Sequence, residues 1–162
     1  MATAIIYYSQ GGTTDTVAKT LAKNLNADLI RIYDLKNRKG IKNSLFSTID
    51  AFREAKTEIK PENVDLRGYD TIYIGSPTWT GNPAPAIITL IDRLDLRAKD
   101  VILFATMDSN RGDTNIKRLK EKVKIRGARV INSFTIKTKG KSVNQLINDT
   151  ETIIEMKDLK IY

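Results

Sequence analysis

The residues best suited to chemistry form a stretch rich in glycine and hydroxyl groups near the N-terminus. Residues 9–16 read SQGGTTDT and separate an apolar run from a segment of helical periodicity. Glycines allow a sharp turn that directs several backbone N–H groups at one point, and a helix N-terminus favours an anion there. The stretch lacks the lysine of a Walker A loop and the G-x-G-x-x-G spacing of a dinucleotide loop. It indicates a phosphate-binding loop, with a tight turn capped by threonine as the alternative.

Two later stretches have the composition of binding loops. Residues 75–85 hold the single tryptophan, Trp79, among hydroxyl side chains, glycines and prolines. An indole in such a loop suits stacking on a flat ring, and the alternative is a core residue that covers the end of a sheet. Residues 106–113 are polar and contain Gly112. Taken alone, this third stretch is equally consistent with a solvated turn that leads into a helix.

The absence of two residue types excludes several kinds of chemistry. The chain contains no histidine and no cysteine. Disulfides, thiol catalysis, iron–sulfur clusters and nucleophiles activated by histidine are therefore excluded, and we expect no zinc or copper site. Redox chemistry in this protein would require an organic cofactor.

Short runs rich in Ile, Val, Tyr and Phe alternate with amphipathic segments along the chain. The runs predict five strands, over residues 3–8, 28–33, 70–75, 101–105 and 129–136. Strands separated by helices are typical of βαβ units, so we expect an α/β fold with a parallel sheet and helices on both faces.

The polarity of the strands predicts their order in the sheet. The first, third and fourth are nearly continuous apolar runs, which is typical of strands buried on both faces. The second carries Arg31 and the fifth alternates polar with apolar residues, which places both at the edges. This pattern favours a doubly wound five-stranded sheet of order 2-1-3-4-5 in a single domain over residues 1–162. A further helix is expected over residues 41–52, ended before Pro61.

In such sheets a ligand binds beyond the carboxyl ends of the strands, where the strand order reverses. The loops at that point follow the first, third and fourth strands. They are the three stretches whose composition is unusual.

At this level the chain resembles the flavodoxin family. The stretch from Ile5 to Leu21, with Ser9, Gly12 and Thr14 in its loop, is similar to the phosphate-loop signature of that family. Residues 69–94, with their Pro-x-Trp sequence, resemble its first flavin-contact segment, and residues 101–113 resemble the second. The resemblance implies non-covalently bound FMN and a low-potential electron carrier between redox enzymes, which is not itself an enzyme.

The resemblance also implies where FMN binds. The phosphate would lie on the first loop and the isoalloxazine between the second and third, with Trp79 stacked on one face. The implied FMN-binding residues are Ser9, Gln10, Gly11, Gly12, Thr13, Thr14, Pro77, Thr78, Trp79, Thr80, Gly81, Asn82, Thr106, Met107, Asp108 and Gly112. No catalytic residue and no metal ligand is implied.

Two other functions stay open. An FMN-dependent NAD(P)H:quinone or flavin oxidoreductase could use similar loops, although no nicotinamide site is evident in the sequence. A flavodoxin-like module that has lost FMN and binds only a partner is the second alternative. A phosphorelay receiver shares the sheet order but is excluded, because Ser9 and Ser76 follow the strands where it needs acidic residues.

Three features depart from the family pattern. Thr80 stands where many members have glycine after the stacking aromatic, and the third loop has no aromatic, so that Met107 would cover the second face of the flavin. The third departure is the net charge of +8, since flavodoxins are usually acidic.

The positive charge is concentrated in one part of the chain. Between residues 117 and 129 every charged residue except Glu121 is basic. The stretch is either a solvated helix face or a docking surface for redox partner proteins with acidic surfaces. It lacks interleaved aromatics, so nucleic acid is not expected. No apolar run is long enough to span a membrane, and we expect a cytoplasmic monomer.

Overall fold

The computed structural model describes residues 2–36, 57–108 and 110–162, and it confirms the five parallel strands expected from the sequence. They are β1 (Ala2–Tyr8), β2 (Asp28–Asp34), β4 (Tyr69–Trp79), β6 (Asp100–Met107) and β7 (Arg129–Lys137). Their order across the sheet is β2-β1-β4-β6-β7, and each neighbouring pair is parallel. This is the doubly wound 2-1-3-4-5 order.

Two short strands were not expected. β3 (Ile59–Lys60) pairs antiparallel with β2, and β5 (Asn82–Pro83) pairs antiparallel with the end of β4. Each has only two residues, too few for a hydrophobic period to form. The helix expected over residues 41–52 lies outside the described residues.

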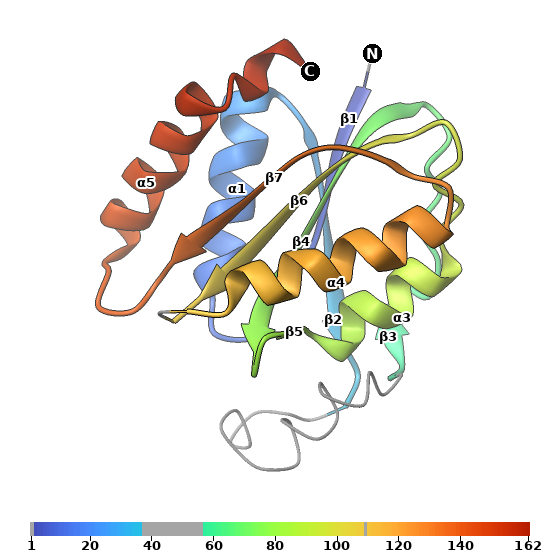
Figure 1. The fold of residues 1–162 in the computed structure, drawn as a ribbon, viewed down its shortest axis with the longest axis horizontal. Coiled ribbons are helices and arrows are strands. Elements are labelled where there is room, and N and C mark those ends of the chain that lie inside the picture. The colour runs from blue at the N-terminus through green and yellow to red at the C-terminus, as the bar shows by residue number, and fades with distance from the viewer. Residues whose placement is uncertain (1, 37–56, 109) are drawn as a thin grey trace.

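Helices cover both faces of the sheet (Figure 1). They are α1 (Thr13–Leu25), α3 (Pro85–Arg93), α4 (Gly112–Ile125) and α5 (Val143–Met156), followed by the short 3₁₀ helix η1 (Leu159–Ile161). The helices α1 and α5 pack together on one face, while α3 and α4 pack on the other. Within the described parts of the chain, no helix is long and apolar enough to cross a membrane.

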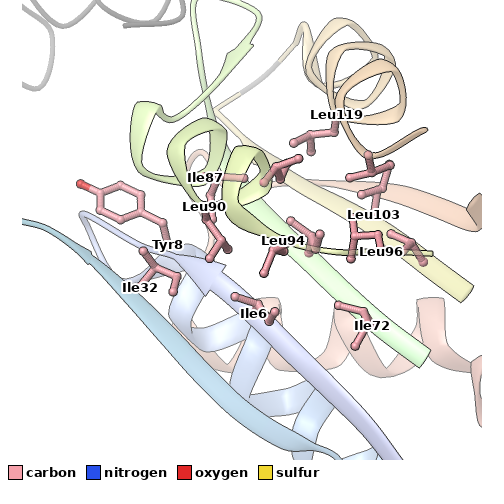
Figure 2. Close-up of a cluster of buried hydrophobic side chains, with 14 of the residues drawn as sticks. Ile6, Tyr8, Ile32, Ile72, Ile87, Leu90, Leu94, Leu96, Leu103 and Leu119 are labelled. Atoms are coloured by element: carbon pink, nitrogen blue, oxygen red, sulfur yellow. The ribbon is translucent and has the colours of Figure 1, made fainter. Parts of the chain in front are cut away.

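The two faces bury separate apolar clusters. One lies between the sheet and the helices α3 and α4, and Figure 2 shows Ile6, Ile72 and Leu103 of the strands facing Ile87 and Leu119 of these helices. The other lies between the sheet and the helices α1 and α5. Burial of these side chains holds the strands in register and fixes the edge at which their carboxyl ends meet.

One glycine in β4 is required by packing. Gly75 is the cross-strand partner of Phe104 in β6, and the Phe104 ring covers it. A Cβ atom added at Gly75 would lie 2.0 Å from Phe104 Cζ. The Phe104 ring thus packs directly on the Gly75 backbone. This contact holds β4 against β6 just before the residues of the candidate site.

Candidate functional site

Direct contacts join the three loops at the carboxyl edge of the sheet. The buried hydroxyls of Thr14, at the start of α1, and Thr106, at the end of β6, lie 2.7 Å apart. The Asn115 Nδ2 of α4 donates to Pro77 O at 3.0 Å and to Thr78 Oγ1 at 2.9 Å. The structure therefore brings together the three stretches selected from the sequence.

The first loop turns sharply at Gly12, which has a φ of 95°. The Gly12 N–H donates to Ser9 Oγ at 3.1 Å, and Gly12 O accepts the first helical hydrogen bond from Thr16 N at 3.0 Å. The N–H groups of Thr13, Thr14 and Asp15 precede that bond and have no acceptor within the helix. No side chain caps α1, and a Cβ at Gly12 would meet nothing within 4 Å. The helix N-terminus is thus open to an anion.

A network of charged and polar side chains from β1, α1 and β2 holds this loop in place. Tyr7 Oη donates to the Asp15 carboxylate, which also pairs with Lys19 Nζ at 2.8 Å and with Arg31 Nη1 at 3.3 Å. Arg31 Nη2 donates to Ser9 O at 3.2 Å and so fixes the loop directly. Arg31 was interpreted from the sequence only as a sign of an edge strand, and its contact with the loop was missed.

The network settles the charge of Asp15. Burial alone would raise the pKa of this carboxyl, but hydrogen bonds from Lys19 and Tyr7 and the positive charges of Lys19 and Arg31 lower it overall. Burial, together with the bond to Asp15, raises the pKa of Tyr7. Near neutral pH the network therefore holds an ionised carboxylate offset by two cations, and it adds no net negative charge beneath the anion site.

The second loop is a two-residue hairpin that joins β4 to β5. Thr78 pairs with Pro83 and Trp79 with Asn82, which leaves Thr80 and Gly81 as the turn. Both have positive φ, 53° and 78°, as a type I′ turn requires. A β-branched residue in this conformation is unusual and costs about 1–2 kcal/mol. The loop expected from proline and glycine content is therefore a strained but regular extension of the sheet.

Trp79 is half-buried at the end of β4, where its indole meets Tyr8 of β1 edge to face. The ring centroids lie 5.9 Å apart with an interplanar angle of 86°. Figure 2 shows Tyr8 at one end of the apolar cluster, with its hydroxyl directed away from it. The structure therefore confirms that Trp79 packs on the core, and its stacking on a flat ring stays a prediction. The contact with Tyr8 fixes the plane of the indole.

The third loop connects β6 to α4 and is held by sulfur. Gly112 N lies 3.1 Å from Met107 Sδ, to which it donates. A Cβ at Gly112 would lie 2.5 Å from this sulfur and 2.9 Å from Thr135 Cγ2. Met107 is therefore packed under the turn, and Gly112 is buried at the first position of the helix. Asp108 is exposed.

The site residues expected from the sequence differ in exposure. Those that are buried and act in the framework of the loops are Ser9, Thr14, Gly81, Thr106 and Gly112. Those that are exposed or half-buried are Gln10, Gly11, Gly12, Thr13, Pro77, Thr78, Trp79, Thr80, Asn82, Met107 and Asp108. Asn115 was missed, because an asparagine within a helical segment gives no signal that it binds a loop from another strand.

The fold and this loop arrangement define a doubly wound α/β protein whose three polar loops meet at its topological switch point. The model of the flavodoxin family matches residues 2–154. The chain therefore belongs to the flavodoxin family.

Individual relatives agree with this assignment. Flavodoxin 1 of Salmonella typhimurium is 26% identical over 110 residues, a match that covers 65% of this chain but only 49% of the relative. A flavoprotein of Lactobacillus acidophilus, solved in complex with FMN, is 27% identical with a TM-score of 0.72 over 83% of this chain and 92% of that one. Oxidised flavodoxin 1 of Bacillus cereus, 20% identical, shares the fold with a TM-score of 0.60 over 96% of this chain and 98% of that one.

Proposed function

We propose that this chain is an electron carrier that binds FMN non-covalently between its three loops. The observation that carries the proposal is the open N-terminus of α1 at Gly12, tied to the ring-binding loops through the hydroxyl contact between Thr14 and Thr106. The flavodoxin family and the FMN complex of the Lactobacillus acidophilus protein support the choice of cofactor. When bound, FMN supplies reversible electron uptake.

The described residues fit this cofactor. The loop from Ser9 to Thr14 contains no charged side chain, and it offers backbone N–H groups and hydroxyls to a phosphate. Residues 78–82 and 106–108 would hold the ring, with Trp79 providing an aromatic face. Because the sheet and both apolar clusters extend along most of the chain, we propose that residues 1–162 act as one FMN-binding domain.

A flavin titration with the single tryptophan as reporter tests the proposal. We expect added FMN to quench Trp79 fluorescence with a stoichiometry of about one, since a stacked ring accepts its excitation energy. NADPH alone should then leave the bound flavin oxidised. NADPH together with a separate, added electron-transfer reductase should reduce it. Absence of flavin binding would contradict the proposal, and rapid oxidation of NADPH by the protein alone would favour the oxidoreductase.

We also propose that the lysine face of α4 docks redox partners with acidic surfaces. The basic stretch at residues 117–129 is not helical throughout, because α4 ends at Ile125 and Arg129 lies in β7. Arg129 pairs with Asp100 at 2.6 Å and Arg118 with Glu121 at 3.8 Å. Of the other five basic residues, Lys117, Lys120 and Lys124 share one face of the helix by their spacing. That face begins one turn beyond the third loop.

Reoxidation by an inorganic acceptor of negative charge measures this field directly. In the doubly substituted Lys117→Glu, Lys120→Glu protein, we expect the rate with ferricyanide to fall several-fold at low ionic strength and to recover in about 1 M salt. Lys23→Glu, an exposed lysine in the last turn of α1, makes the same kind of charge change away from α4. If the rate falls equally per charge changed in the two proteins, only the net charge of the protein affects the reaction. That result would contradict a docking role for this face of α4.

A further inference from the structure

Arg111 has an unusual backbone conformation at the start of α4. It is the N-cap residue of the helix, with φ 67° and ψ 10°, in the left-handed region that disfavours residues other than glycine. The next residue, Gly112, is fixed by Met107 and Thr135, so the turn has little freedom to relax. Strained positions of this kind are retained mainly where they serve a site.

The Arg111 side chain reaches from the third loop to the second. A Cβ atom built on Gly81 would lie 3.1 Å from Arg111 Nε and 3.3 Å from both Cζ and Nη2. The guanidinium therefore lies against the Gly81 backbone, at the tip of the hairpin. Gly81 is buried although its neighbour Thr80 is exposed, which is consistent with this cover.

No carboxylate neutralises this guanidinium within the parts of the chain that the structure describes. Four other arginines form ion pairs with aspartates: Arg31 with Asp15, Arg67 with Asp65, Arg97 with Asp95 and Arg129 with Asp100. Asp108 and Asp113 are near Arg111 in sequence, and among the ion pairs of the described residues none joins either of them to Arg111. Arg111 thus keeps a full positive charge between the two loops proposed to hold the ring.

We propose that Arg111 sets the reduction potential of the bound flavin by stabilising the charge that the ring gains on reduction. The inference rests on the proposed FMN function. The oxidised ring is neutral, so the addition of two electrons from a donor protein and one proton from solvent gives it one net negative charge. Arg111 is exposed, and its positive charge beside the proposed ring site favours that state over the oxidised one by about tenfold in binding. Arg111 thus makes the potential less negative than the loops alone would make it.

Potentiometry of three variants tests this role. In Arg111→Gln we expect the potential of bound FMN to become more negative, and the preference for reduced over oxidised FMN to fall about tenfold. Arg111→Lys keeps the charge and should retain most of the preference. Lys23→Gln removes one positive charge on the far helix α1 and should leave the potential nearly unchanged.

The outcomes separate this inference from the function on which it rests. A wild-type protein that binds no FMN would overturn both. A wild-type protein that binds FMN, with the same potential in Arg111→Gln as in Lys23→Gln, would overturn the role of Arg111 and leave the electron carrier intact. A loss of the preference in Arg111→Gln that Arg111→Lys does not share would support the charge as its cause.

Discussion

The Gly12→Asp protein should fail to bind FMN. A Cβ atom at this position would meet no neighbouring atom, so an aspartate has room beside the N-terminus of α1, although the φ of 95° strains any side chain there. Its carboxylate would occupy the region toward which the N–H groups of the first turn point, and it would repel the phosphate there. Like charges placed together at a binding surface cost several kcal/mol, so the dissociation constant should rise by more than about 100-fold, as measured by fluorescence titration.

Two control variants separate the effect of the added charge on FMN binding from the effect of a side chain on the backbone of the loop. Gly12→Asn has nearly the same shape and tolerance for the positive φ of 95°, but carries no charge. Gly140→Asp adds the same carboxylate at a glycine with φ 72° that is also open to solvent, after β7. We expect both to bind FMN far more tightly than Gly12→Asp. If Gly12→Asp and Gly12→Asn bind FMN with equal affinity, the phosphate does not bind at this loop.

Replacement of Trp79 by Ala should produce the second large effect. Stacking of an aromatic side chain on a nucleobase is worth about 1–3 kcal/mol, and an isoalloxazine offers a larger face. The edge-to-face contact with Tyr8 holds the indole in one plane before any ligand arrives, so little ordering entropy opposes stacking. We expect the dissociation constant to rise about 10–100-fold. Loss of the only tryptophan requires absorbance or flavin fluorescence as the readout.

Trp79→Phe is the matched control, because it keeps an aromatic face and part of the contact with Tyr8. It should retain most of the affinity. Trp79 also packs on the apolar core, so thermal unfolding of each flavin-free variant must be compared. An unchanged flavin affinity in a folded Trp79→Ala protein would mean that the indole serves the core alone.

Much of the fold could be predicted because burial leaves a strong pattern. The strands β1, β4 and β6 are buried on both faces and read as continuous apolar runs, which fixed their existence and their central place. Their ends were less predictable. β4 continues through Pro77 to Trp79, since its last two residues pair with the short strand β5. A pairing of two residues leaves no periodic signal.

The location of the candidate site could be predicted from the sequence. The side chains that hold its loops in place could not. Its three loops follow from strand order, which the apolar pattern determines. The side chains that hold them, Arg31 and Asn115, act across long sequence separations, and each has an ordinary local explanation. Thr80 at positive φ was unpredictable from propensity, because tertiary pairing imposes a conformation that threonine alone avoids.

The hydroxyl contact between Thr14 and Thr106 has a consequence for the thermodynamics of the whole site. It links the loop proposed for the phosphate to the strand end proposed for the ring, over 92 residues of sequence. Asn115 links the first turn of α4 to the end of β4, where the hairpin begins. The site that we propose for the phosphate and the ring is therefore assembled during folding. The entropy of ordering three loops is lost once, when the chain folds, and a ligand that arrives later gains the benefit of a preorganised host.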